Sequence, residues 1–234
     1  MLAASHIFKP GAISKWIDII DYSDRLHLAI KDVNEFSNKY DILPRPCNVF
    51  NMFRMIYPCD VKVVIVAQSP YPDSCPCTKI EYAFGPAFLP SPGCVTTPLI
   101  LKNIILEASR DMCKKSDKLP NEIVMDWIEQ GVMMLNASLT IGKNCPEYLE
   151  DHSIVWEEIM IRILNKISAL YDPVFLLVGT KAWKFENSID AKIIKILDPS
   201  PSLQKHNPWM GSGVFSKISN ILIEKEVMPI IWIK

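Results

Sequence analysis

Four short runs of apolar residues recur along the chain, and longer segments of mixed polarity separate them. They read VKVVIV at 61–66, VMML at 132–135, VFLLV at 174–178 and KIIKIL at 192–197. Uninterrupted apolar runs of this length suit strands that are covered on both faces, as in a parallel sheet. We therefore expect four buried strands that belong to one parallel sheet.

The segments between these runs carry apolar residues at the three- and four-residue spacing of a helix face. This spacing is found at Leu101, Ile104, Ile105 and Ala108, at Ile154, Ile159, Ile163 and Ile167, and at Ile218, Ile221 and Leu222. Two further helices are predicted over 13–20 and 23–38, each beginning near a serine, Ser14 or Ser23, that can cap it.

Helices followed by alternating strands and helices predict an α/β fold. The expected architecture is a three-layer α/β/α sandwich with a central four-stranded parallel sheet and right-handed crossovers. We expect a single domain over residues 1–234, in which residues 1–42 form an N-terminal helical extension.

The composition is that of a globular protein, with 49% hydrophobic and 22% charged residues. The net charge of −1 gives no bulk attraction to nucleic acid, so such binding would need a local basic face. The seven cysteines are odd in number, and Cys75 and Cys77 form the one close pair. Without a second pair they make a poor metal site, so we expect reduced thiols and no metal.

Targeting and membrane signals are missing from the sequence pattern. The first sixteen residues lack the apolar run of a signal peptide, and no segment approaches the roughly 20 apolar residues of a membrane span. We expect a soluble intracellular protein with no membrane partner.

The loop after each predicted strand is where ligands are expected, because open parallel sheets bind them at the carboxyl ends of their strands. These loops read AQSPYP at 67–72, LNASLT at 135–140, GTKAW at 179–183 and LDPSPSLQKHNPWMGSG at 197–213. Asn136 offers an amide that matches the edge of a nucleobase or caps a turn. Tyr71 and Phe84 are loop aromatics that stack on a flat ligand or pack against the core.

The fourth loop combines proline rigidity with hydroxyl groups at Ser200 and Ser202. Hydroxyls and backbone N–H groups of a rigid loop suit phosphate oxygens. Cations from this loop, the next helix and the neighbouring loop would supply a local basic face, although such clusters are usually solvated surface. These cations are Lys205, His206, Lys217, Lys181 and Lys184.

An ordered set of motifs resembles the uracil-DNA glycosylase family from about Leu43 to the C-terminus. The motifs are KVVIVAQSPY, AFG at 83–85, KNIILEA at 102–108, WIEQGVMMLNASLTIG at 127–142, DHSIVWEEI at 151–159, VFLLVGTKAW at 174–183, DPSPS at 198–202 and VFSKISNIL at 214–222. LNASLT is similar to the cellular and herpesvirus branch, whereas Pro72 and the PIIW near the end are similar to the poxvirus branch.

The resemblance implies a protein that unstacks a uridine from DNA and hydrolyses the bond between base and sugar. By position, Gln68 would line the base pocket, Tyr71 would exclude thymine, Phe84 would stack on the base and Asn136 would read its amide edge. The resemblance also implies DNA contacts in the fourth loop, at Ser200 and at Ser202 and Leu203. Lys205 and Lys217 of the local basic face are further expected DNA contacts.

Two departures fall on catalytic positions of the family. Ser69 stands where the family has an aspartate that orients water, and Asp198 stands where it has a histidine that donates to the uracil. Ser202 takes the place of the leucine that enters the DNA stack, with Leu203 one position on. Loss of a charge-stabilising or proton-handling group costs roughly 10²–10⁴ in rate, so two such losses would severely impair hydrolysis.

Three functional hypotheses follow from this pattern. The first is a slow or altered glycosylase, in which Asp198 orients the water or offsets the sugar cation in place of the missing aspartate. The second is a noncatalytic DNA-binding protein or replication adaptor. The third is a scaffold whose site has no ligand.

The resemblance also implies partners and surroundings. We expect no cofactor, because the family chemistry uses water, and a monomer that acts on uracil-containing or single-stranded DNA. A protein of a replication complex is a further expected partner. The expected location is the nucleus or a site of DNA replication, or the cytoplasm if the source is microbial or poxvirus-like.

Overall fold

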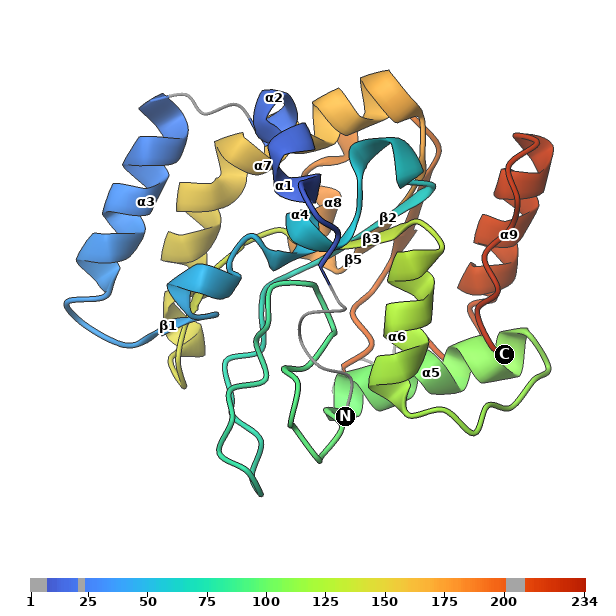
Figure 1. The fold of residues 1–234 in the computed structure, drawn as a ribbon, viewed down its shortest axis with the longest axis horizontal. Coiled ribbons are helices and arrows are strands. Elements are labelled where there is room, and N and C mark those ends of the chain that lie inside the picture. The colour runs from blue at the N-terminus through green and yellow to red at the C-terminus, as the bar shows by residue number, and fades with distance from the viewer. Residues whose placement is uncertain (1–7, 21–23, 201–208) are drawn as a thin grey trace.

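A four-stranded parallel sheet forms the centre of the molecule, as the apolar runs predict (Figure 1). The computed structural model describes residues 8–20, 24–200 and 209–234. The strands lie side by side in the order β3-β2-β5-β6. Their bounds are β2 Val63–Ala67, β3 Val132–Asn136, β5 Val174–Val178 and β6 Ile193–Ile196. The expected α/β sandwich with its central parallel sheet is therefore confirmed.

Burial along the strands explains their composition. Every residue of β2, β3 and β5 is buried, whereas β6 at the sheet edge is partly open and exposes Lys195. Strands covered on both faces have no polar side, which is why the apolar runs are uninterrupted. The predicted run 61–66 starts two residues before β2. The Lys62 backbone N–H donates to the Gly131 carbonyl, just before Val63 and Val132, the first paired residues of β2 and β3.

Helices cover the sheet in two groups (Figure 1). On one side α7 packs with α2 and α3, and on the other α5 packs with α6 and α9. Their bounds are α2 Ile17–Ile20, α3 Asp24–Phe36, α5 Leu99–Asp111, α6 Pro120–Glu129, α7 Leu149–Tyr171 and α9 Val214–Glu224. Shorter helices are α1 Ala12–Lys15, α4 Asn51–Met55 and α8 Thr180–Trp183, with 3₁₀ turns η2 Pro46–Asn48, η3 Pro58–Asp60, η4 Pro146–Tyr148 and η5 Glu186–Ser188. No described helix is long and apolar enough to cross a membrane.

The N-terminal helices differ from the prediction in their detail. The helix expected over 13–20 is divided into α1 and α2 at Trp16, whose indole is buried and donates to the Ile56 carbonyl at 2.9 Å. Ser14 does not cap it: Gly11 precedes α1 with a left-handed φ of 69°, and Ser14 donates back to the Gly11 carbonyl. Ser23 lies outside the described residues.

A small antiparallel pair was not predicted. Strand β1 (Ile42–Leu43) pairs with β4 (Ile141–Gly142) and joins the end of the N-terminal segment to the loop after β3. Two-residue strands are too short to show a period in sequence. The long segment 68–98 between β2 and α5 extends from the sheet as loops (teal to green in Figure 1) and supplies most of the site described next.

Candidate active site

A cavity of about 320 Å³ opens at the carboxyl end of β2. The turn after β2, the loop 83–88, the start of α5 and the loop after β6 line it. Its lining residues are Ala67, Gln68, Ser69, Pro70, Tyr71, Pro72, Ala83, Phe84, Gly85, Pro86, Phe88, Ile100, Asp198 and Ser200. The structure thus brings Gln68, Ser69, Tyr71, Phe84, Asp198 and Ser200 together, as the sequence predicts.

The wall that carries Phe84 is held rigidly from behind. Gly85 has a φ of 113°, and a Cβ atom there would lie 2.4 Å from the Asn48 carbonyl oxygen, so glycine is required. The buried amide of Asn51 donates to the Phe84 carbonyl at 2.9 Å. The Phe84 ring is 8% exposed, and the Phe8 ring stacks beside it with centroids 6.4 Å apart. Phe84 is therefore fixed at the cavity surface.

Tyr71 lines the cavity and is held there by a hydrogen bond that its neutral hydroxyl donates. Its hydroxyl donates to the Phe88 carbonyl at 3.2 Å, and Phe88 has a left-handed φ of 62° that turns the chain there. Burial, with a further contribution from the negative charge of Asp198, raises the pKa of Tyr71 well above its ordinary value. The phenol consequently keeps its proton throughout the physiological range.

Asn136 lies at the end of β3, beside the cavity rather than in its lining. It pairs in register with Ala67, and its Nδ2 donates to the Gly85 carbonyl at 3.4 Å. Its side chain is buried, and Oδ1 has no hydrogen-bond partner among the described residues. A buried acceptor without a partner costs free energy, which is typical of a group kept for a ligand. The geometry therefore agrees with an amide that awaits a donor.

Gln68 and Ser69 are positioned by the backbone of the neighbouring loop. Ala137 N donates to the Ala67 carbonyl at 2.7 Å, and Ser138 N donates to the Gln68 carbonyl at 3.1 Å. These bonds extend the pairing of β2 with β3 past the end of the strands. The half-buried Ser69 hydroxyl reaches the cavity as a neutral group that can hold a water molecule.

Asp198 enters the cavity from the loop after β6. Its Oδ1 accepts a hydrogen bond from Ser200 N at 2.8 Å, and Asn103 of α5 donates to the Pro199 carbonyl at 2.9 Å. Burial raises the pKa of Asp198, although the Ser200 N–H opposes that rise. The Asp198 carboxyl group is therefore fixed by the Ser200 N–H in a cavity lined by both polar and apolar residues.

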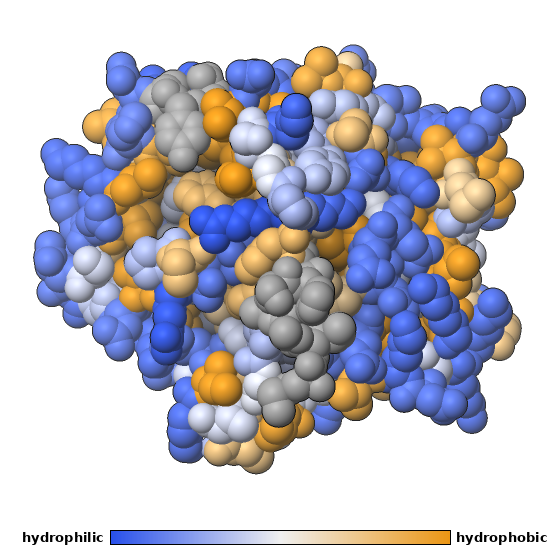
Figure 2. Space-filling view, in the orientation of Figure 1, coloured by the Kyte–Doolittle hydropathy of each residue, from blue (hydrophilic) through white to orange (hydrophobic). Residues whose placement is uncertain are grey.

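Two lysines of the predicted basic face are paired with glutamates in the structure. Lys181 pairs with Glu150, and Lys184 pairs with Glu157 at 2.8 Å, so both lysines contact acidic side chains of α7. Lys217 is exposed on α9 and does not line the cavity. Figure 2 shows that this side of the molecule mixes hydrophilic and hydrophobic residues. The predicted contacts Ser202, Leu203, Lys205 and His206 lie outside the described residues.

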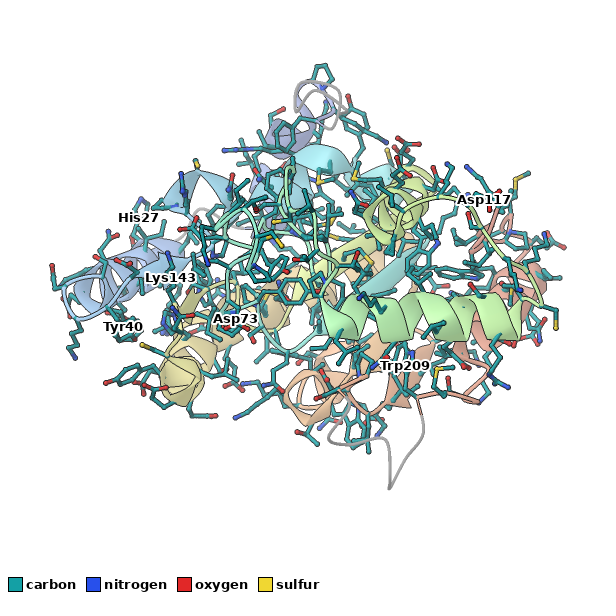
Figure 3. The ribbon with its side chains drawn as sticks, turned by 90° about the horizontal axis from the view of Figure 1, so that it is seen from below. His27, Tyr40, Asp73, Asp117, Lys143 and Trp209 are labelled. Carbon is teal, nitrogen blue, oxygen red and sulfur yellow. The ribbon has the colours of Figure 1, made fainter. Side chains whose placement is uncertain are left out.

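Glu107 is a supporting residue that the sequence analysis missed. It is fully buried on α5, and its carboxylate accepts from Gly211 N at 2.8 Å, Gly213 N at 3.0 Å and the Ser212 hydroxyl at 3.2 Å. Trp209, labelled in Figure 3, is buried two residues before Gly211, and its ring meets the Phe215 ring edge-on with centroids 6.4 Å apart. A carboxylate on the apolar stripe between Ile104 and Ala108 was the signal available in the sequence.

Metal ligation finds no support in the described part of the chain, where no group of three or more His, Cys, Asp or Glu residues is placed to hold an ion. The polar groups of the cavity are instead amides, hydroxyls and one carboxyl. The chain is thus an α/β protein with a parallel sheet and a cavity at the carboxyl end of its strands, which is where ligands bind in proteins of this class.

Comparisons with known proteins refine this class. A uracil-DNA glycosylase of Human herpesvirus 7 (strain JI) is 31% identical over 228 residues, covering 93% of this chain and 85% of the relative. One from Desulfitobacterium hafniense is 34% identical over 196 residues, covering 82% of each. The crystal structure of mimivirus uracil-DNA glycosylase matches the fold with a TM-score of 0.80 at 23% identity, covering 100% of this chain and 90% of that one. No protein-family model matches the chain.

The curated relatives align with most of the chain at more than 30% identity. The chain therefore belongs to the uracil-DNA glycosylase family, which confirms the resemblance of its motifs.

Proposed function

We propose that this protein binds a uracil nucleotide, unstacked from DNA, in the 320 Å³ cavity and that it releases the base slowly. The observation that carries the proposal is the unpartnered Oδ1 of Asn136 beside a cavity lined by Tyr71 and Phe84. A uracil ring would stack on Phe84 and present its N3–H donor to this acceptor.

Discrimination against thymine would rest on Tyr71. Its ring is fixed by the bond to the Phe88 carbonyl and cannot move aside without breaking it. The C5 methyl group of thymine would need the volume that this ring occupies. Gln68, held through its carbonyl by Ser138 N, would add a polar contact within the same turn.

Slow release would follow from Ser69. Hydrolysis places positive charge on the sugar, and a neutral hydroxyl supplies no counter-charge. Ser69 can still position a water molecule for attack. We expect base recognition to exceed the catalytic power of the site by a wide margin.

The test measures binding and uracil release on the same oligonucleotides, containing uracil or thymine, for the native protein and for Ser69→Asp. Ser69→Asp is expected to raise the release rate about 10²-fold or more, because it supplies the missing charge. The matched control is Ser37→Asp at the exposed residue that follows α3, which should leave the rate unchanged. Equal binding of uracil and thymine DNA, with no release by either protein, would reject the proposal.

A second candidate is a noncatalytic DNA-binding protein or replication adaptor on the same fold. It is favoured by Ser69, which leaves the turn after β2 without a carboxylate. Salt-sensitive binding of uracil-containing or single-stranded DNA without any release would support it. In either case we propose that the protein acts as a monomer at a site of DNA replication. This site would be in the nucleus, or in the cytoplasm if the source is microbial or poxvirus-like.

A further inference from the structure

We propose that Cys75 and Cys94 form a redox modification site, at which a peroxide joins their two sulfurs in a reversible disulfide. This bond weakens uracil binding by acting on the cavity through Tyr82 and Tyr71. The disulfide itself does not depend on the proposed function, whereas its effect on the cavity rests on that function. Both cysteines belong to the long segment 68–98, which extends from the sheet and supplies most of the cavity wall (Figure 1).

The thiols of Cys75 and Cys94 lie next to each other, although they are far apart in the loop. The Cys94 thiol donates to the Ile80 carbonyl at 3.8 Å, and the Cys75 backbone N–H donates to the same carbonyl at 2.7 Å. The two side chains are also hydrogen-bonded to each other. Both are free thiols in this structure. A disulfide requires two cysteines whose side chains already approach each other, and this pair meets that condition.

The surroundings of Cys75 stabilise its thiolate. The side chain is buried, and its sulfur lies 3.2 Å from Thr96 Oγ1. Burial alone would raise the pKa of Cys75, but hydrogen bonds from the hydroxyl and backbone N–H groups of Thr78 and Thr96 outweigh burial and lower the pKa to about 5. The thiolate is the form of cysteine that reacts with oxidants. Cys75 is therefore the member of the pair that a peroxide oxidises first.

The turn that follows Cys75 gives an oxidant access to its sulfur. Residues 76–80 are all exposed, and the turn is closed by a hydrogen bond from Lys79 N to the Cys75 carbonyl at 2.8 Å. Exposed turns with few buried contacts open locally at low free energy. Hydrogen peroxide is close to water in size, so a small opening admits it. We therefore expect a peroxide, rather than a bulky disulfide, to be the oxidant.

The reaction balances with one peroxide as the oxidant. The Cys75 thiolate attacks a peroxide oxygen, the O–O bond breaks, and hydroxide leaves and takes a proton from solvent, so that Cys75 becomes a sulfenic acid. Burial and the negative charge of Cys75 raise the pKa of Cys94 to about 11, and the second of these causes disappears once Cys75 is neutral. The Cys94 sulfur then bonds to Cys75 Sγ, and its proton leaves with the sulfenic hydroxyl as water. Two thiols and one peroxide thus give one disulfide and two waters, and a thiol reductant reverses the bond.

Thr96 connects this pair of cysteines to the cavity. Its hydroxyl is shared between Cys75 Sγ and the hydroxyl of the buried Tyr82. The Tyr82 ring packs beside the Tyr71 ring, with centroids 5.7 Å apart, and Tyr71 lines the cavity. A disulfide removes the negative charge of Cys75 and leaves the Thr96 hydroxyl with a weaker acceptor. Oxidation therefore loosens the support of Tyr82, and with it the part of the wall where Tyr71 would meet the uracil ring.

The first measurement identifies the bond. The full chain is treated with stoichiometric hydrogen peroxide, its remaining thiols are alkylated, and its peptides are analysed by mass spectrometry. We expect the native protein to lose two free thiols and two hydrogen atoms, to yield peptides joined through Cys75 and Cys94, and to recover both thiols with dithiothreitol. Cys77→Ser, which removes the exposed thiol two residues from Cys75, is the matched control and should form the same bond. Cys94→Ser should form no such bond and should stop at a sulfenic acid on Cys75, which dimedone traps.

The second measurement tests the coupling to the cavity. It compares reduced and oxidised protein in their affinity for a uracil-containing oligonucleotide and in the hydrogen exchange of residues 83–88, which carry part of the cavity wall. We expect the oxidised native protein to bind about tenfold more weakly, a typical coupling between two sites, and to exchange faster in this segment. Cys75→Ser, whose fold is checked by circular dichroism, should show neither effect of peroxide because it lacks the reacting thiolate.

The outcomes separate this inference from the proposed function. Retention of all free thiols, or a disulfide between other cysteines, would overturn the modification site. A bond between Cys75 and Cys94 that changes neither uracil affinity nor hydrogen exchange would overturn the coupling to the cavity. Absence of uracil binding by the reduced protein would count against the proposed function, and the mass and exchange measurements would still decide the disulfide and its coupling.

Discussion

The buried amide of Asn51 donates a hydrogen bond to the backbone carbonyl of Phe84 at 2.9 Å. Asn51 is itself held, because its Oδ1 accepts from Arg54 at 3.2 Å and its Nδ2 also contacts Asn48 Oδ1 at 3.0 Å. A helix that does not touch the cavity thus sets the position of the aromatic ring in its wall.

Replacing Asn51 with alanine should weaken both the fold and the site. The Phe84 carbonyl would be left buried without its partner, which costs about 1–3 kcal/mol of unfolding free energy. Urea denaturation measures this loss, and Asn220→Ala on the exposed surface of α9 is the control that should change little. A variant as stable as the native protein would show that the Asn51 bond contributes nothing.

The stability of the fold should fall in mild acid because of His152. This side chain is fully buried, and burial lowers its pKa to about 4. The Thr140 hydroxyl accepts from Trp156 Nε1 at 2.6 Å and shares a hydrogen bond with His152 Nδ1 at 2.8 Å, and His152 Nε2 lies 3.3 Å from the Tyr40 hydroxyl. Figure 3 labels Tyr40 at this end of the molecule.

A lowered pKa means that the unfolded chain binds the proton first as pH falls. The stability that depends on neutral His152 is therefore complete above pH 6.5 and is lost on the way down to about pH 4. The slope should approach 1.4 kcal/mol per pH unit, measured as unfolding free energy at several pH values. His152→Gln should flatten this slope, whereas the exposed His27→Gln should retain it; equal slopes in both variants would contradict the assignment.

Asp198 should make the protein less stable as pH rises, which is opposite to the pH dependence that His152 contributes. Its raised pKa means that the folded protein holds the proton more tightly than the unfolded chain, so its contribution is greatest below the ordinary value of 3.8 and is lost as pH rises through the folded pKa. Asp198→Asn removes this penalty and should raise the melting temperature at pH 7, with the gain shrinking toward acid pH. Asp117→Asn in an exposed loop is the control, and a destabilised Asp198→Asn at pH 7 would contradict the prediction.

Glu107 should be one of the more sensitive positions outside the cavity. Burial alone would raise its pKa, but the hydrogen bonds from Arg110, Gly211 and Gly213 outweigh burial and lower it, so the group is a charged acceptor. Glu107→Ala leaves those donors unpaired and should cost about 3–5 kcal/mol. Thermal melts of Glu107→Ala, with Glu129→Ala on exposed surface as control, measure it. A change of similar size in both variants would refute a specific anchoring role.

Most of the sheet and the cavity could be predicted from the sequence, because both depend on local pattern. Apolar runs locate the strands, and residues just after β2 and β6, such as Ser69 and Asp198, meet at one rim since parallel strands share their carboxyl edge. The ion pair of Lys181 with Glu150 could not be predicted, because it depends on how α8 lies against α7. The roles of Asn51 and Glu107 escaped notice for the same reason: their partners are backbone groups distant in sequence.

The order of strands in the sheet has a consequence for how the chain folds. The first central strand, β2, finds both of its neighbours far along the sequence, with Val63 opposite Val132 on one side and Val174 on the other. Contacts of such long sequence separation carry a large loop-closure entropy and form slowly. Asp198 follows β6, which pairs with β5, so we expect the pocket that joins it to Ser69 to form late in folding, after β5 and β6 have docked. Uracil binding would then report complete folding rather than mere collapse.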